Sequence, residues 1–190
     1  MTENLDCSGF VFDTTSLSHF ALIDRIDVLG DFVRSVPCGT SSVVLEEIRQ
    51  GVSKHPQLGA ISGQQWLAHH RIDDSIARLG RFVELSSVFG AQNGRNFGEA
   101  SVLAVAMELG ATAIIDDLSA KRVALAHYGA VHGTLWLLAE VWRTGGATET
   151  QLCNLVDQLA DSGMRLPCKG GEFPDFVKGN KLGRWSRAKR

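Results

Sequence analysis

The sequence predicts an α/β domain with a central parallel sheet of about five strands. Short apolar runs of β character alternate with longer segments of helical period, which is the order expected of βα units. The chain has 190 residues, of which 44% are hydrophobic and 21% are charged. A chain of this size and composition can bury one substantial core without disulfides or structural metal. No internal repeat or low-complexity stretch interrupts the alternation.

Five short segments are expected to form the strands. Four are mainly apolar, and the third carries a pair of histidines within an otherwise strand-like run. The second is the weakest of the five. In chain order they are residues 10–12, 33–38, 66–72, 112–115 and 130–132.

Helices are expected after each strand, with one more helix leading into the fourth strand. The strongest helical pattern covers residues 98–109 and ends at Gly110. The other helices are predicted over residues 17–21, 42–51, 73–89, 118–128 and 135–143. Polar residues that favour helix N-termini precede or open them: Thr14, Thr15 or Ser16, Ser41 or Ser42, Asp73 or Asp74, and Thr134.

The sheet domain is expected to span residues 1–144, and residues 145–190 follow as an extension. The extension begins with a helix to about Asp161, marked by Thr148 and Gln151 in a capping-box pattern. It ends in a tail, residues 178–190, that holds six basic and no acidic residues, whereas the rest of the chain holds 13 basic and 21 acidic ones. A solubilising tail is the more common reading of such a run, and a nucleic-acid-binding arm is the alternative.

Cysteine usage and hydropathy indicate a cytoplasmic protein without membrane contact. The four cysteines are scattered and form no C-x-x-C pair, so buried thiols are favoured over a zinc site or a disulfide frame. No apolar run approaches the roughly 20 residues that cross a bilayer. The N-terminus lacks the basic and apolar regions of a signal peptide.

Carboxylates follow two of the predicted strands directly. Asp13 follows the first strand, and the pair Asp116–Asp117 follows the fourth. The carboxyl ends of parallel strands lie at one edge of the sheet, where ligands bind. Glu99 begins the helix that leads into the fourth strand and is therefore expected at the same edge. The pair Glu46–Glu47 lies on the helix after the second strand and reaches this edge only if that helix leans over it.

Several carboxylates in one cleft would have to take up protons or bind a cation. Two like charges about 4 Å apart repel by roughly 4 kcal/mol at an effective dielectric constant of 20. Oxygen donors suit Mg²⁺ or Mn²⁺ rather than zinc, and such an ion can activate a water and neutralise a phosphodiester. Each acid also has a purely structural reading: Asp13 and Asp117 as helix caps, Glu99 in a capping box with Asn96, and Glu46 and Glu47 as surface charges.

Four segments carry a family resemblance. They are FVFDTTSL at residues 10–17, VVLEEIRQG at 43–51, GEAS at 98–101 and IIDDLSA at 114–120. In this order they resemble the motifs of a PIN domain, the metal-dependent ribonuclease fold of VapC-type toxins and related nucleases. The resemblance covers about residues 9–144, and its most specific part is the Gly-Glu-Ala start of a helix.

The register of the motifs selects one acid from each pair. In the second motif the functional acid precedes an apolar residue and has a glycine four positions later, which favours Glu47 over Glu46. In the fourth motif many members have a threonine two places before the acid, which aligns Asp117 with the functional carboxylate. Here Ile115 takes the threonine position, so Asp116 stays open as a substituting or outer ligand.

The resemblance implies a three-layer α/β/α domain, a Mg²⁺ or Mn²⁺ site, RNA as substrate, frequent homodimers and, in many cases, a cognate antitoxin. The catalytic residues that it implies are Asp13, Glu47, Glu99 and Asp117. The metal ligands that it implies are Asp13, Glu99 and Asp117, with Asp116. The residues expected to support the acids or the substrate are Thr14, Thr15, Ser16, Lys121 and Arg122.

The leading hypothesis is an endoribonuclease that hydrolyses RNA by water attack, with the toxin of a toxin–antitoxin pair as its most specific form. A catalytically weak RNA-binding or antitoxin-binding module of the same fold is the alternative. A Mg²⁺-dependent aspartyl phosphotransfer domain is disfavoured. Thr15 stands where haloacid-dehalogenase-like enzymes have a second aspartate, and residues 131–133 lack the lysine of receiver domains.

Overall fold

The computed structural model, which describes residues 8–90 and 96–180, contains a five-stranded sheet whose paired strands all run parallel. The strands are β1 (Phe10–Phe12), β2 (Cys38–Ser41), β3 (Leu67–His70), β4 (Thr112–Ile114) and β5 (Val131–His132). Their order across the sheet is β3-β2-β1-β4-β5. The winding direction therefore reverses between β1 and β4, which is where parallel α/β sheets place their ligands. The predicted parallel α/β fold is confirmed.

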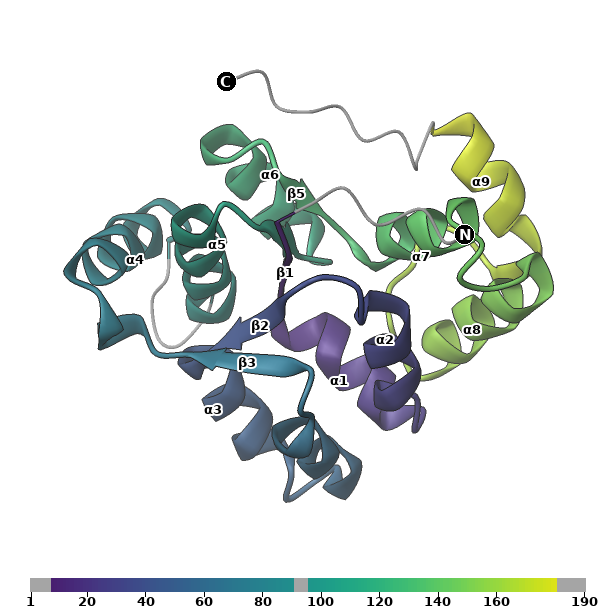
Figure 1. The fold of residues 1–190 in the computed structure, drawn as a ribbon, viewed down its shortest axis with the longest axis horizontal. Coiled ribbons are helices and arrows are strands. Elements are labelled where there is room, and N and C mark those ends of the chain that lie inside the picture. The colour runs from purple at the N-terminus through teal and green to yellow at the C-terminus, as the bar shows by residue number, and fades with distance from the viewer. Residues whose placement is uncertain (1–7, 91–95, 181–190) are drawn as a thin grey trace.

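Helices flank the sheet (Figure 1). Helices α1 and α3 contact each other and the 3-10 segment at Pro56–Gly63, while α5 packs against α4 and against β1, β2 and β4. Their bounds are α1 (Thr14–Leu22), α2 (Ile26–Val33), α3 (Ser42–Gly51), α4 (Ile76–Val88), α5 (Phe97–Leu109), α6 (Leu118–His127), α7 (Thr134–Arg143), α8 (Glu149–Asp161) and α9 (Phe173–Gly179). Two further 3-10 turns cover Ile72–Asp74 and Gly170–Glu172.

The second strand does not lie at residues 33–38, where the sequence predicted it. Val33 is the last residue of α2, a helix that the sequence reading missed although its buried residues recur at helical spacing. The strand itself has the sequence CGTS, and its two hydroxyl side chains are buried with partners. Thr40 donates to the Phe12 carbonyl at 2.8 Å, and Ser41 shares a 2.6 Å hydrogen bond with Ser101. A strand built this way has no apolar run to reveal it.

Three predicted helix caps are wrong. Thr14, Thr15 or Ser16 was expected to cap the first helix, but α1 begins at Thr14 and its N-cap is Asp13. Ser75 caps α4 through a hydrogen bond from the Arg78 amide, whereas Asp73 and Asp74 lie in the preceding 3-10 turn. Thr134 is the first residue of α7 and not its cap, because Gly133 occupies the N-cap position. The hydroxyl of Thr134 donates a hydrogen bond to Asp116 instead. The predicted caps at Asp13, Ser41, Asp117 and Thr148 are found in the structure.

The extension after residue 144 packs onto the sheet domain and adds to its core. It contains α8 and also α9, a helix that the sequence did not predict. Both helices contribute buried residues to the cluster that holds the strands: Leu152, Leu155, Val156, Leu159, Phe173 and Val177. Most of the basic tail, Cys7 and most of the loop before Asn96 lie outside the described residues. Within residues 8–90 and 96–180, no helix is long and apolar enough to span a bilayer.

Candidate active site

Asp13 is held rigidly at the carboxyl end of β1. It caps α1, accepting hydrogen bonds from the Ser16 amide at 2.8 Å and the Ser16 hydroxyl at 2.5 Å on Oδ1. Its Oδ2 accepts from the Asp116 amide at 3.1 Å. The side chain is only 2% exposed. The structural reading of Asp13 as a helix cap is thus correct, and it also fixes a buried carboxylate beside β4.

Asp116 faces Asp13 across the Ser16 hydroxyl. Ser16 Oγ lies 3.0 Å from Asp116 Oδ2, so one hydroxyl proton serves two carboxylates. Thr134 donates to Asp116 twice, from its amide at 2.8 Å and from its hydroxyl at 2.6 Å. A β-carbon on Gly133 would lie 2.8 Å from Asp116 Oδ1, so this carboxylate occupies space that only glycine leaves open. Burial, followed by the charge of Asp116, raises the pKa of Asp13 to about 7.

Glu47 is the member of its pair that faces the other acids. The Thr14 hydroxyl donates to Glu47 Oε2, and a β-carbon on Gly98 would lie 2.6 Å from that same oxygen. Glu46 points to solvent, where it pairs with Arg49 at 2.7 Å. The glycine of the Gly-Glu-Ala segment therefore makes room for the Glu47 carboxylate beside Glu99.

Glu99 lies between two other carboxylates. Burial raises the pKa of Glu99, and the charges of Glu47 and Asp117 raise it further. The capping box expected with Asn96 does not form, because Asn96 is in the left-handed region and donates its amide to the Phe89 carbonyl instead. The structural reading of Glu99 is therefore wrong.

Asp117 differs from Asp13 and Glu99 in its surroundings. It is exposed and caps α6, accepting from the Ser119 hydroxyl at 2.5 Å and the Ala120 amide at 2.8 Å. The Ser119 hydrogen bond, with a smaller contribution from the Arg165 charge, lowers the pKa of Asp117. Asp117 is near enough to Glu99 to affect its pKa, whereas Asp116 is near Asp13. The two adjacent aspartates thus serve different parts of the acidic cluster.

The residues expected to support the acids lie in four different settings. Thr14 and Ser16 hydrogen-bond Glu47 and Asp13, as expected. Lys121 lies beside Gly133; burial lowers the pKa of Lys121, and the charge of Asp116 partly opposes this. Thr15 lines the pocket next to the acids without bonding to one. Arg122 is exposed on α6, and among the described residues no contact joins it to the acids.

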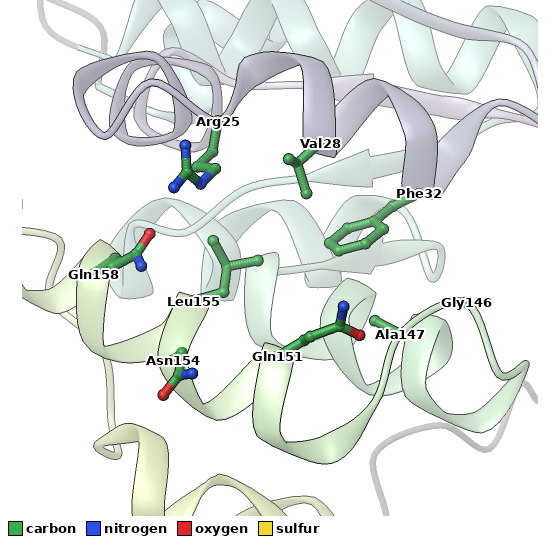
Figure 2. A pocket seen from close by; sticks show the side chains of 9 residues that line it. All are labelled: Arg25, Val28, Phe32, Gly146, Ala147, Gln151, Asn154, Leu155 and Gln158. Atoms are coloured by element: carbon green, nitrogen blue, oxygen red, sulfur yellow. The ribbon is translucent and has the colours of Figure 1, made fainter.

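A pocket of about 720 Å³ adjoins the carboxyl ends of β4 and β5. Asp116, Asp117 and Lys121 line one side, and the segment from Gly163 to Pro167 lines the other. A second pocket, of about 280 Å³, lies between α2 and α8 (Figure 2). Arg25 is the one ionisable residue that lines this second pocket, and no carboxylate lines it. The larger pocket is therefore the one of the two that lies beside the carboxylates.

The donor set fits a hard divalent cation in chemistry and charge. The raised pKa values of Asp13 and Glu99 reflect burial and repulsion that a cation would relieve. Five side chains offer the carboxylate oxygens that such an ion prefers: Asp13, Glu47, Glu99, Asp116 and Asp117. In the described part of the chain, however, no three such side chains are grouped closely enough to hold one ion. Asp13 and Asp116 form one subgroup, while Glu47, Glu99 and Asp117 form the other. A three-ligand set would require side-chain rotation.

Three residues near the acids were missed by the sequence reading. Thr134 was taken for a helix cap, yet its position directly after the exit of β5 could have indicated a contact with Asp116. His19 was not singled out from the sequence; it lines the pocket and hydrogen-bonds Ser162 at 2.8 Å. Arg165 lies in the extension, far from every motif, and no sequence signal pointed to it.

Comparison with known proteins adds a family match over most of the chain. A family model described as a PIN domain matches residues 9–170. The match extends beyond residue 144 through α8 and the segment that lines the larger pocket. No curated protein and no solved structure matches the chain.

Proposed function

The chain belongs to the PIN domain family, and we propose on that premise that it is a metal-dependent endoribonuclease. PIN domains are usually nucleases and generally use divalent metals, so the fold is of nuclease type. The observation that carries the proposal is that five carboxylates from four separate segments lie in two subgroups near the switch point of the sheet. Asp13 and Glu99, which have raised pKa values, make this cluster unfavourable without a counter-charge.

Asp13, Glu99 and Asp117, together with Asp116, are the residues that would hold Mg²⁺ or Mn²⁺. The bound ion would supply charge neutralisation at the phosphodiester and acidity to a water. Hydroxyl groups of the chain itself hold the carboxylates in position, with Ser16 between Asp13 and Asp116, Thr134 on Asp116, and Thr14 on Glu47. Lys121 is the cation beside Asp116 that would face a substrate phosphate.

Hydrolysis by water, without a covalent intermediate, agrees best with the surroundings of Asp13 and Ser16. Ser16 is 1% exposed and its hydroxyl is engaged with both aspartates, so it is not open to attack a phosphate. Both carboxylate oxygens of Asp13 accept hydrogen bonds, and the residue is 2% exposed. This burial also weighs against the aspartyl phosphotransfer alternative, in which Asp13 itself would attack phosphorus.

A homodimer and a cognate antitoxin belong to the same proposal, as does the toxin role. Ile76 and Val83 on α4 are 92% and 62% exposed, and a protein partner that covered this helix would bury them. Measurement of the molar mass in solution tests the dimer. Co-purification with the product of the adjacent gene tests the antitoxin.

Cleavage of RNA by the purified full chain in Mg²⁺ or Mn²⁺ tests the central proposal. Asp13→Asn and Glu99→Gln should each reduce the cleavage rate at least about a hundredfold, because each removes one charged oxygen donor. Glu47→Gln and Glu46→Gln form a matched pair on one helix, and only the former should lose activity. Equal rates in wild type, Asp13→Asn and Glu99→Gln would defeat the assignment. Tight RNA binding without cleavage across several divalent metals would instead favour the RNA-binding module.

A further inference from the structure

The pocket beside Asp116 and Asp117 has two chemically different ends. The acidic end holds Asp116, Asp117 and Lys121. The other end is mainly apolar and is made largely by the extension, through Met164, Leu166, Pro167 and Phe176, together with Leu118, Leu135 and Trp136 of the sheet domain. A phosphate would be attracted to the cations and the metal at the first end and would gain nothing at the second. The apolar end needs a different occupant.

The apolar end is shaped before any ligand binds. The Trp136 ring stacks on His132 with 3.8 Å between ring centroids and 10° between planes, and it is 6% exposed. Met164, which also lines the pocket, is buried as well. Leu118, at the start of α6, is 63% exposed and stands directly after Asp117. The pocket volume of about 720 Å³ lies in the range of sites that enclose a small organic group.

The extension also supplies a cation to the pocket. Arg165 lines the pocket, and its charge acts on Asp117. Within residues 8–90 and 96–180, no ion pair engages its guanidinium, so Arg165 is available to a ligand. Arginine binds phosphate oxygens and also stacks on planar rings. Lys121 and Arg165 therefore border the acids from the sheet domain and from the extension.

We propose that this pocket is a nucleotide subsite, in which residues of the extension help to bind an unpaired base next to the scissile phosphate. The inference rests on the proposed function, because the acidic end places the phosphodiester. A base in a duplex has both faces covered by its neighbours and cannot enter a pocket, whereas an unpaired base can be turned out and bound on apolar and aromatic surfaces. Arg165 would contact a phosphate of the nucleotide whose base is bound in the pocket.

Abasic scanning of a short single-stranded RNA tests the subsite. Each position in turn loses its base, and binding to the full-length Glu99→Gln chain is followed by fluorescence anisotropy in Mg²⁺, so that the RNA remains whole. Removal of one particular base should weaken binding about fivefold or more, which is the effect of losing one stacked base. In the Glu99→Gln/Leu118→Ser chain the same removal should cost about twofold or less. Because Leu118 is largely exposed, its substitution should leave the fold intact.

A matched control lies on the same helix. Leu125 is 47% exposed on α6 and does not line the pocket, so Leu125→Ser should keep the full sensitivity to base removal. Indifference of every chain to base removal would overturn the subsite, and so would equal sensitivity in the Leu118→Ser and Leu125→Ser chains. The latter result would leave the apolar end to another occupant, such as an apolar side chain of a protein partner.

Cleavage of the same RNAs by the wild-type chain separates failure of the subsite from failure of the proposed function. Cleavage that is unaffected by base removal overturns the subsite alone. Base-dependent binding without any cleavage by wild type overturns the nuclease proposal and leaves the subsite standing. Absence of RNA binding overturns both.

Discussion

Substitution of Asp13 by asparagine should stabilise the metal-free protein while removing its activity. The pKa of Asp13 is raised from 3.8 to about 7 by burial and by the charge of Asp116, so the folded state disfavours the ionised form. The difference of about three pKa units corresponds to roughly 4 kcal/mol of lost stability once Asp13 is ionised in both states. This value is an upper bound, since Asp13 and Asp116 share the Ser16 hydroxyl.

Asparagine removes this cost but does not keep every hydrogen bond. Its carbonyl oxygen can still accept from Ser16, which preserves the cap of α1. Its amide group cannot accept from the Asp116 amide, as Oδ2 of Asp13 does, and the loss of that bond costs about 1–3 kcal/mol. The net gain at pH 8 without metal should therefore be about 1–3 kcal/mol.

The sign of the pH dependence follows from the direction of the shift. Because the folded-state pKa of Asp13 is raised, the folded chain binds more protons than the unfolded chain between about pH 4 and pH 7. Across that window the stability of wild type relative to Asp13→Asn should fall by about 1.4 kcal/mol per pH unit at most. Above about pH 7 the difference should become constant. Below about pH 4, where Asp13 is protonated in both states, this contribution should vanish.

Urea unfolding in EDTA at intervals between pH 5 and pH 8 measures the effect, with Asp31→Asn as the control for the loss of an exposed carboxylate. Subtracting the unfolding free energy of wild type from that of Asp13→Asn at each pH removes the contributions of the other titrating groups. Added Mn²⁺ should then stabilise wild type and stabilise Asp13→Asn much less, because binding to the folded state adds stability through mass action. A variant less stable than wild type at pH 8 without metal, or a difference independent of pH, would refute the reasoning.

Two further substitutions test the packing around the acids and the rest of the fold. Gly133→Ala should displace the Asp116 carboxylate, since the new methyl would lie 2.8 Å from Oδ1, and should reduce the rate of RNA cleavage about tenfold or more. The control is Gly171→Ala, whose new methyl would meet nothing within 4 Å and which should cleave RNA at the wild-type rate. Equal rates in the two variants would contradict the assigned role of Gly133. Arg78 is 6% exposed and pairs with Glu108 at 2.5 Å, so Arg78→Ala should lower the unfolding free energy by about 3 kcal/mol in urea titration, whereas Arg71→Ala at an exposed ion pair should change it by less than about 1 kcal/mol.

The parts of the fold predicted correctly are those whose physical cause is local in sequence. β1 (FVF) and β4 (TAI) are mainly apolar three-residue segments that are fully buried, and hydropathy identifies them. β2 was not predicted because its buried side chains include hydroxyl groups, which hydrogen-bond other segments, as Thr40 does with the Phe12 carbonyl. α2 was overlooked for a different reason: its buried residues do recur at helical spacing, but the run after it was taken for a strand.

The same distinction applies to the site. Asp13 and Glu99 could be placed at the sheet edge from element order, since each lies at a strand end or a helix start. The choice of Glu47 over Glu46 came from the resemblance, and the structure adds the contact with Gly98. Arg165 could not be found, because its position depends on how the segment after α8 folds back over the strand ends. That path is set by packing of α8 and α9 on the core, which no short motif encodes.

The structural and functional readings of an acid at a strand end are not true alternatives. In a βα unit the residue after the strand is also the residue before the helix, so a carboxylate there is positioned to cap the helix and to face the ligand edge at once. The environment separates the two roles better than the position does. Asp117 caps α6, is exposed and has a pKa lowered by the hydrogen bond from the Ser119 hydroxyl and then by that from the Ala120 amide, so its local hydrogen bonds favour the ionised state. Asp13 caps α1 and yet has a pKa near 7, and Glu99, in the first turn of α5, has a raised pKa. A helix cap gains from being ionised, whereas these two lose by it; a bound cation is what would reverse that loss.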